Sequence, residues 1–261
     1  MEIIEAIILG LVQGLTEFLP VSSSGHLVMV QTLLGVEPES GIVFEVALHL
    51  ATLVAIVVFY HKRVWALTIG TLTFDPETWR YVGKLAIGTL PAILVALTVR
   101  DLIEAWFESP MIVGVMLLIT GGIVWSTRYT IGRGQLREPS WRDAFLIGCA
   151  QAFAIMPGIT RSGTTVATAM ALGMSPLAAA EFSFMLGIIA MAGAAVLLAP
   201  DIANASTGVL TAILAGGGVA LVSGLFALFS FVWLLRSRLF YVFAWYAWLV
   251  GGSFLLWLLL A

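Results

Sequence analysis

The stretch TEFLPVSSSGHL, residues 16–27, interrupts an N-terminal segment that is otherwise apolar. It brings a carboxylate, a proline, three consecutive serines, a glycine and a histidine together. A second polar stretch, PGITRSGTT at residues 157–165, interrupts another apolar segment. Non-helical backbone at membrane depth must be shielded from lipid, because unpaired backbone polar groups are costly in hydrocarbon. These two breaks therefore decide the fold.

The rest of the chain is typical of an integral membrane protein. Of its 261 residues, 61% are hydrophobic and 10% are charged, and the mean hydropathy is +1.06. Soluble domains carry about 25% charged residues. The sequence predicts an all-α polytopic membrane protein with a single membrane domain, surrounded by lipid and without a nucleic-acid partner. Cys149 is the only cysteine, which excludes an internal disulfide and a cysteine-rich metal site. Six segments are apolar and long enough to cross a hydrocarbon core of about 30 Å, namely 41–60, 82–99, 111–127, 177–198, 208–235 and 239–259.

Two further apolar segments, 3–35 and 143–175, contain the breaks. Each arm is too short for a full crossing, so each segment predicts a re-entrant helical hairpin that enters and leaves by the same face. A pair of short, tilted spans is the alternative. With both hairpins re-entrant, ten basic residues fall on one side of the membrane, which marks it as cytoplasmic. These residues are Lys62, Arg63, Arg80, Lys84, Arg128, Arg133, Arg137, Arg142, Arg236 and Arg238.

The two broken segments also resemble each other. A shift of 138 residues superposes Gln13 on Gln151 and Ser24-Gly25 on Ser162-Gly163, with 11 identities in 43 positions. We therefore predict an internal repeat, about 1–127 and 139–261, in which each half is one re-entrant hairpin followed by three transmembrane helices. An odd number of crossings inverts the second copy relative to the first, so that the tips of the two hairpins meet near the midplane.

The tips carry groups suited to an anion. We call residues 20–26 the serine tip and residues 157–164 the arginine tip. Ser22 to Gly25 and Thr160 to Gly163 are each expected to precede a helix start, where free N–H groups attract negative charge. Arg161 adds a planar, permanently charged fork that suits phosphate oxygens. The alternative role for Arg161 is to pair with Glu17 and hold the hairpins together.

The first arm supplies reactive side chains. Gln13 and Glu17 are four residues apart and share a helix face. Glu17, His26 and the serines offer a base or metal ligand, a proton carrier and a nucleophile. One of the three serines is expected to cap the second arm.

Other features are given structural roles. Glu45 and Glu181 are expected to support the hairpins through hydrogen bonds, and His49 lies one turn after Glu45. The glycine-rich stretch 215–224 predicts close helix packing. Tryptophans and tyrosines, Tyr241 and Tyr246 among them, are typical of interfacial belts.

The stretches QGLTEFLPVSSSGHL and PGITRSGTT together resemble the undecaprenyl-diphosphate phosphatases of bacteria, the bacitracin-resistance type of membrane phosphatase. The resemblance implies hydrolysis of the terminal phosphate of an isoprenoid diphosphate lipid, which regenerates the carrier for cell-wall synthesis. It also implies a divalent cation (Mg or Ca), location in the bacterial plasma membrane, and an active site open to the outer, periplasmic face. A homodimer is a further expectation.

The resemblance and the chemistry of the residues together give the expected roles in the site. Gln13 and Glu17 fill the first motif and are the expected metal ligands, with Gln13 in place of the glutamate that many members carry. Glu17, Ser23, His26 and Arg161 are the expected catalytic residues. Ser23 is expected to attack, with His26 as proton acceptor or donor, and a metal-activated water is the variant to Ser23. Pro157 belongs to the second motif, and the expected substrate-binding residues are Gln13, Ser22, Ser24, Gly25, Gly158, Thr160, Ser162, Gly163 and Thr165.

A carrier or flippase for isoprenoid phosphates is the alternative function. Inverted repeats with broken helices at the midplane are typical of secondary transporters. The cluster of Glu17, the serines and His26 opposite Arg161 is richer in reactive groups than ligand binding requires, which favours the enzyme. The two functions can also coexist.

Overall fold

The computed structural model describes residues 2–35, 41–203 and 207–260. Positions 1, 36–40, 204–206 and 261 of the two predicted repeats lie outside the described residues. The described chain is helical, and apart from an isolated β-bridge between Leu136 and Met174 it contains no strand. Its helices are α1 (Ile3–Phe18), α2 (Ser23–Leu34), α3 (Gly41–Phe59), α4 (His61–Leu72), α5 (Pro76–Thr98), α6 (Arg100–Phe107), α7 (Pro110–Ser126), η2 (Thr127–Tyr129), α8 (Trp141–Phe153), α9 (Arg161–Ala171), α10 (Pro176–Ala203), α11 (Thr207–Arg236), η3 (Phe240–Val242) and α12 (Phe243–Leu260).

The predicted crossings correspond to six of these helices, namely α3, α5, α7, α10, α11 and α12. Among the described residues, five helices are long and apolar enough to span a membrane, and the bent pair α3–α4 makes a sixth. The prediction of an all-α polytopic membrane protein is confirmed. Two helices were not predicted, α4 and α6. At Tyr60 the chain turns by 83° into α4, which begins with three polar residues and buries none of its residues.

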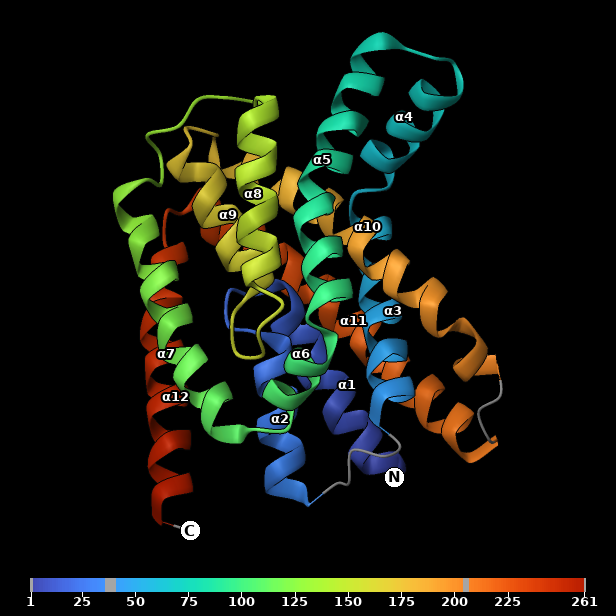
Figure 1. The fold of residues 1–261 in the computed structure, drawn as a ribbon, viewed down its shortest axis with the longest axis vertical. Coiled ribbons are helices and arrows are strands. Elements are labelled where there is room, and N and C mark those ends of the chain that lie inside the picture. The colour runs from blue at the N-terminus through green and yellow to red at the C-terminus, as the bar shows by residue number, and fades with distance from the viewer. Residues whose placement is uncertain (1, 36–40, 204–206, 261) are drawn as a thin grey trace.

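Both predicted hairpins are present, and their tips face each other. In Figure 1, α1 and α2 form a hairpin that opens toward the end of the molecule where the N-terminus lies, whereas α8 and α9 open toward the opposite end. A Cβ atom on Gly25 of the serine tip would lie 3.0 Å from the Cα atom of Gly158 in the arginine tip. The tips therefore touch through backbone, as glycine permits. Re-entrance and the inverted repeat stay predictions.

The first arm of each hairpin packs closely on a long helix. A Cβ atom on Gly10 of α1 would lie 2.2 Å from the carbonyl oxygen of Gly216 in α11. In the other hairpin, a Cβ atom on Gly148 of α8 would lie 2.3 Å from the carbonyl oxygen of Gly88 in α5. Gly10 and Gly148 are the pair that the 138-residue shift superposes. The prediction that the stretch 215–224 packs closely is confirmed.

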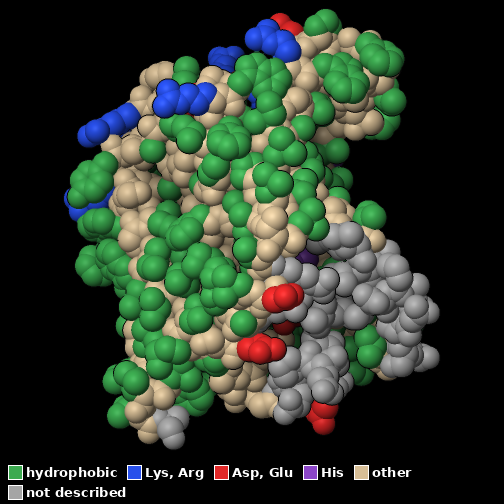
Figure 2. Space-filling view, viewed as in Figure 1, with side chains coloured by type: hydrophobic (Ala, Val, Ile, Leu, Met, Phe, Trp, Pro, Cys, Tyr) green, Lys and Arg blue, Asp and Glu red, His purple; other side chains and the backbone are tan. Residues whose placement is uncertain are grey.

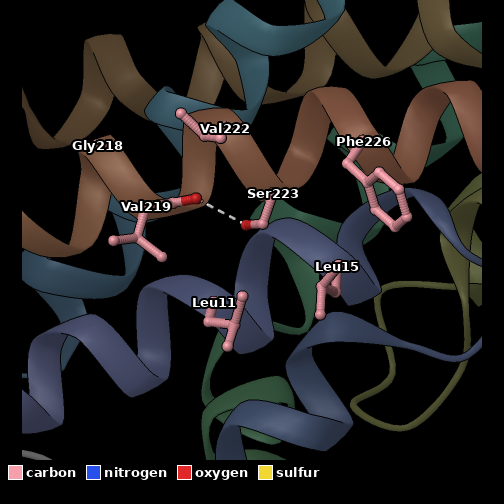
Figure 3. Close-up of a pocket in the computed structure, with 7 residues that line it drawn as sticks. All are labelled: Leu11, Leu15, Gly218, Val219, Val222, Ser223 and Phe226. Carbon is pink, nitrogen blue, oxygen red and sulfur yellow. Dashed lines mark hydrogen bonds between the residues drawn. The ribbon is translucent and has the colours of Figure 1, made fainter.

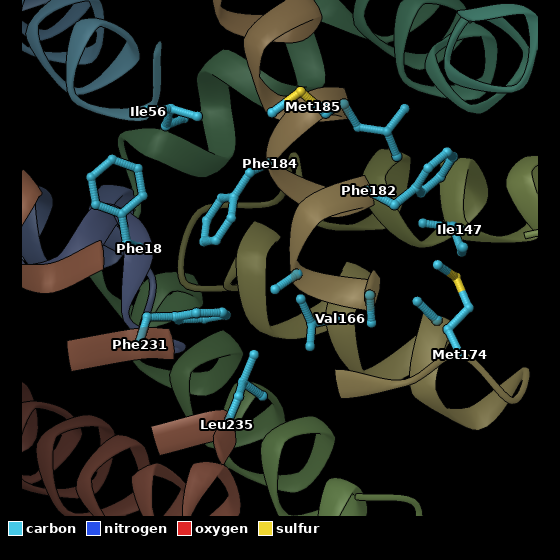
Figure 4. Close-up of a cluster of buried hydrophobic side chains, with 14 of the residues drawn as sticks. Phe18, Ile56, Ile147, Val166, Met174, Phe182, Phe184, Met185, Phe231 and Leu235 are labelled. Atoms are coloured by element: carbon cyan, nitrogen blue, oxygen red, sulfur yellow. The ribbon is translucent and has the colours of Figure 1, made fainter. Parts of the chain in front are cut away.

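An aromatic core holds the inner end of α1 in place. Phe18 lies edge-on to Phe184 of α10 with ring centroids 5.8 Å apart, and Phe184 contacts Phe231 of α11 at 5.0 Å. Figure 4 shows these rings between α1, α10 and α11. All three are fully buried. Edge-to-face ring pairs add about 0.5–1.5 kcal/mol each beyond their buried area, so the neighbouring residue Glu17 stands on a rigid element.

Charge is distributed unevenly along the molecule. Figure 2 shows Lys and Arg side chains at the end where α4 and the starts of α5 and α8 lie, and most of the visible Asp and Glu side chains toward the other end. Arg80 and Lys84 lie near the start of α5, and Arg142 lies in the first turn of α8. This separation agrees with the predicted assignment of the basic residues to one side.

The contact at Gly10 makes a testable prediction. Gly10→Ala should lower the midpoint of thermal unfolding in detergent, because a methyl group there meets backbone and overpacking costs about 1–3 kcal/mol. Gly252→Ala in α12 is the matched control, since a Cβ atom at Gly252 meets no atom within 4 Å. Equal midpoints for the two variants would contradict the packing at Gly10.

Candidate active site

The carboxylate of Glu17 is the meeting point of the two tips. It lies in the last turn of α1 with 6% of the residue exposed. Its Oε1 atom accepts a hydrogen bond from Nη2 of Arg161 at 2.5 Å. Its Oε2 atom accepts from the Ser23 hydroxyl at 2.6 Å and from Nε2 of Gln13 at 2.9 Å. Gln13 and Glu17 therefore share a helix face as predicted, and the pairing of Arg161 with Glu17, considered as the alternative role, is present.

Arg161 lies in a notch of α10 that a glycine creates. A Cβ atom on Gly187 would lie only 2.0 Å from Nη1 of Arg161. The Sδ atom of Met191, one turn further along α10, is 3.7 Å from Nη2. The guanidinium group is thus fixed by helix packing as well as by Glu17. Sequence reasoning missed Gly187, because nothing in its local sequence indicates the contact.

The serine tip turns sharply at Ser22. This residue caps α2, with its hydroxyl accepting from the backbone N–H of Gly25 at 3.3 Å, which confirms that one serine caps. Its φ of +70° is rare for a residue other than glycine and is typical of strained functional turns. Ser24 lies 3.4 Å from Ser22, measured between the hydroxyl oxygens. Helix α2 begins at Ser23, so Ser23, Ser24 and Gly25 lie in its first turn. The expectation that these residues precede the helix is therefore wrong.

His26 makes its contacts away from Glu17. Its Nδ1 atom is 2.8 Å from the carbonyl oxygen of Ser22, and its Nε2 atom is 3.0 Å from the hydroxyl oxygen of Tyr246 in α12. The rings of His26 and Tyr246 are stacked, with centroids 5.7 Å apart and planes 7° apart. The sequence assigned Tyr246 to an interfacial belt, whereas the structure places it against the predicted catalytic histidine.

A second histidine lies beside the carboxylate. Nε2 of His49 is 3.6 Å from Oε2 of Glu17, and its Nδ1 atom donates to the carbonyl oxygen of Glu45 at 2.8 Å. Oε1 of Glu45 accepts from Gln31 of α2 at 2.8 Å, so the predicted support of a hairpin by Glu45 is confirmed.

The support predicted from Glu181 is wrong. This carboxylate pairs with Nε of Arg63 at 2.8 Å. Arg63 belongs to α4, a helix that was not predicted, and so Glu181 ties α10 to α4 and not to a hairpin.

The arginine tip is held from α7. The hydroxyl of Thr120 donates to the carbonyl oxygen of Gly158 at 2.7 Å and accepts from the backbone N–H of Thr160 at 3.1 Å. Thr160 caps α9, with its hydroxyl accepting from the N–H of Gly163 at 3.2 Å. Helix α9 begins at Arg161, so Ser162 and Gly163 also lie in a first helical turn. Gly158 has a φ of +94°, and a Cβ atom there would lie 2.5 Å from the carbonyl oxygen of Val113.

The remaining predicted residues in this tip and directly after it contact different partners. The Ser162 hydroxyl is 3.5 Å from the carbonyl oxygen of Leu19, and a Cβ atom on Gly163 would lie 3.1 Å from Cβ of Pro20. Both therefore contact the first hairpin. Pro157 is buried, and the hydroxyl of Thr165 bonds to the carbonyl oxygen of Arg161 at 2.8 Å and to the Ser183 hydroxyl of α10 at 2.5 Å. Thr165 thus joins α9 to α10.

The oxygen atoms of Glu17 and Gln13 are suitable ligands for a hard divalent cation whose remaining ligands include phosphate oxygens. Oε1 of Gln13 is buried without a hydrogen-bond partner, beside the Glu17 carboxylate. The described residues hold no group of three or more His, Cys, Asp or Glu side chains placed to bind a metal on their own. Mg²⁺ is commonly bound through one or two carboxylates with substrate phosphates completing its shell. Gln13 and Glu17 fit that kind of site.

Two apolar grooves lie outside this cluster. One, of about 580 Å³, runs between α1 and α11 (Figure 3) and is lined by Leu11, Leu15, Gly218, Val219, Val222, Ser223 and Phe226. The other, of about 370 Å³, lies between α5, α6 and α8 and reaches Ile155 and Met156, just before the arginine tip. Neither groove is lined by any of the predicted site residues.

Comparison with known proteins shows the family of the chain. The family model described as bacitracin resistance protein BacA matches residues 6–253. The undecaprenyl-diphosphatase of Desulfatibacillum aliphaticivorans is 36% identical, with 97% of both chains covered. The undecaprenyl-diphosphatases of Geobacter sulfurreducens and Methanosphaera stadtmanae are 37% and 36% identical, with 99% and 96% of each chain covered. The chain belongs to the BacA family of bacitracin resistance proteins.

Proposed function

We propose that this protein hydrolyses undecaprenyl diphosphate to undecaprenyl phosphate and inorganic phosphate, and so recycles the lipid carrier of cell-wall synthesis. The observation that carries the proposal is the Glu17 carboxylate, which binds the Ser23 hydroxyl of one tip and the Arg161 guanidinium of the other. The relatives named undecaprenyl-diphosphatase support the choice of substrate.

The diphosphate binds between the tips. Arg161 offers charge and paired N–H donors, and the first turns of α2 and α9 offer backbone N–H groups. In phosphoryl transfer, catalysis consists mainly of positioning and of neutralising the charge of the transferred group. A diphosphate that binds Arg161 also frees Oε1 of Glu17 from its partner.

The attacking group is the Ser23 hydroxyl, and Glu17 accepts its proton. The 2.6 Å hydrogen bond from Ser23 to Oε2 makes Glu17 the nearest base, whereas both nitrogens of His26 contact Ser22 and Tyr246. A bond forms from Oγ of Ser23 to the terminal phosphorus as the bond from that phosphorus to the bridging oxygen breaks, and undecaprenyl phosphate leaves. The proton that Glu17 accepted passes to the departing undecaprenyl phosphate, which restores the carboxylate. Glu17 then takes a proton from a water whose oxygen bonds to the phosphorus of the phosphoserine as the bond to Oγ breaks. That proton returns to Oγ of Ser23 as inorganic phosphate leaves. In the variant without a phosphoserine, Glu17 takes the proton from an attacking water.

A divalent cation, Mg²⁺ or Ca²⁺, would be held by Glu17 and by Oε1 of Gln13. When bound, it supplies neutralisation of charge on the phosphate oxygens.

We place the protein in the bacterial plasma membrane with both hairpins re-entrant and the active site open to the periplasmic face. The support is the gathering of Lys and Arg at one end of the molecule, which by the positive-inside rule is cytoplasmic. A homodimer stays a prediction.

Ser23→Ala should reduce phosphate release from undecaprenyl diphosphate in detergent by at least about 100-fold, since the attacking group is lost. Ser253→Ala in α12 is the control and should retain most of the activity, because its exposed hydroxyl bonds to the carbonyl oxygen of Val250 in its own helix. Phosphate release by the wild type in detergent also distinguishes an enzyme from a pure carrier, because a carrier releases no phosphate. Release at the wild-type rate by Ser23→Ala would remove the serine from the attack and leave the water variant.

Gly187→Ala should lower kcat/KM by about 10- to 100-fold, because the methyl group displaces the Arg161 guanidinium by about 1 Å. The matched control is Gly193→Ala in the same helix, where a Cβ atom meets no atom within 4 Å. Equal kinetics in the two variants would mean that the position of Arg161 does not limit the reaction.

The orientation is tested by thiol labelling in a Cys149→Ser background. Glu108 and Gln135 are exposed. Glu108 lies just before α7, and Gln135 lies in the segment between η2, which follows the other end of α7, and α8. A membrane-impermeant maleimide should label Glu108→Cys in intact spheroplasts and Gln135→Cys only after permeabilisation. The reverse pattern would invert the proposed orientation.

A further inference from the structure

His26 is buried, and both of its ring nitrogens are in use. Only 7% of the residue is exposed. A carbonyl oxygen can only accept, so Nδ1 donates its proton to the carbonyl oxygen of Ser22 over 2.8 Å. In the neutral ring Nε2 is then an acceptor, and the Tyr246 hydroxyl at 3.0 Å donates to it. The hydrogen bonds thus form a directed chain from Tyr246 through His26 to Ser22.

The chain ends on the strained residue next to the nucleophile. Ser22 has a φ of +70°, and its carbonyl oxygen accepts from the backbone N–H of His26 at 3.2 Å as well as from Nδ1. Such a conformation persists only where surrounding contacts hold it. The peptide that follows is that of Ser23, whose hydroxyl is aimed at Glu17. Contacts that fix Ser22 therefore also fix the direction of the Ser23 hydroxyl.

Tyr246 reaches the serine tip from the far end of the chain. Its helix, α12, packs along α7, and two residues later Nε1 of Trp248 donates to the carbonyl oxygen of Leu118 at 3.0 Å. Tyr246 is 42% exposed, so its ring is not confined by burial. Instead the ring stacks on His26 with the planes 7° apart, which leaves the hydroxyl directed at Nε2.

We propose that Tyr246 is a positioning residue of the hydrolysis, which through its hydrogen bond to His26 holds the Ser22 turn and so aims the Ser23 hydroxyl at Glu17. The inference rests on the proposed function, in which Ser23 attacks. In this proposal His26 holds the Ser23 hydroxyl in position, and Glu17 accepts its proton.

The test compares Tyr246→Phe with Tyr241→Phe in purified, full-length protein. Tyr241 lies in η3 shortly before α12, and its ring packs edge-on against Trp125 at 5.8 Å. Tyr246→Phe keeps the stacked ring but loses the hydroxyl. Its kcat for phosphate release from undecaprenyl diphosphate in detergent should fall about tenfold, with KM unchanged within about twofold. Tyr241→Phe should match the wild type. Wild-type kcat in Tyr246→Phe, or an equal loss in both variants, would overturn the proposal.

A spectroscopic readout tests the contact without turnover. The chain has three histidines, so ¹⁵N-histidine labelling gives few ring resonances, and His26→Gln identifies those of His26. In Tyr246→Phe the His26 Nε2 resonance should shift as its hydrogen bond is lost, while Nδ1 stays protonated. An unchanged Nε2 resonance would overturn the proposal even if kcat fell. If the wild type released no phosphate while this shift occurred, the proposed function would fail and the contact would stand.

A double variant tests whether Tyr246 acts through His26. In a His26→Gln background, adding Tyr246→Phe should lower kcat no further, because the group that Tyr246 holds has been removed. Additive losses would mean that Tyr246 acts on the reaction by another route, and would overturn the role assigned here.

Discussion

A helix that breaks within a membrane leaves backbone N–H and carbonyl groups without partners, and lipid offers none. The structure meets this constraint by setting the two breaks against each other. Gly25 meets Gly158 backbone to backbone, Ser162 lies beside the carbonyl oxygen of Leu19, and Arg161 crosses to Glu17. Thr120 then satisfies the outer side of the arginine tip. Each tip takes partners from the other, so the contacts that complete the fold also bring the polar side chains of the two tips together.

The polar side chains of the site have different contacts, and their proposed roles differ accordingly. Glu17 contacts Ser23, Arg161 and Gln13, which is why the proposed mechanism gives it binding and proton acceptance. His26 contacts the Ser22 carbonyl oxygen and the Tyr246 hydroxyl, which is why we propose that it holds the conformation of the serine tip. A carboxylate, a serine and a histidine close together in sequence suggest a linear relay, but the turn at Ser22 points the histidine away from the carboxylate.

Much of this arrangement could be predicted from the sequence, because it depends on residues that are close together in the chain or on segments that repeat. Gln13 and Glu17 are one helical turn apart, and each break is flanked by short apolar arms. The Ser-Gly pairs recur in both broken segments. Gly187 and Tyr246 could not be predicted, because their partners lie 26 and 220 residues away and only packing brings them together. The role given to Glu181 was wrong for a related reason. Its partner Arg63 belongs to α4, which bends away from the preceding helix α3. This helix is too short and too polar to be recognised from the sequence as a membrane crossing.

The pairing of Arg161 with Glu17 also bears on how the protein would tell substrate from product. When an arginine already has an anionic partner, a ligand that displaces this partner gains only the difference between the two interaction energies. The diphosphate carries more negative charge than the lipid monophosphate, and so competes better against the carboxylate. In the proposed mechanism, Glu17 would compete for Arg161 again once the terminal phosphoryl group has been transferred to Ser23. The ion pair that joins the tips would then act against the lipid monophosphate and favour its departure.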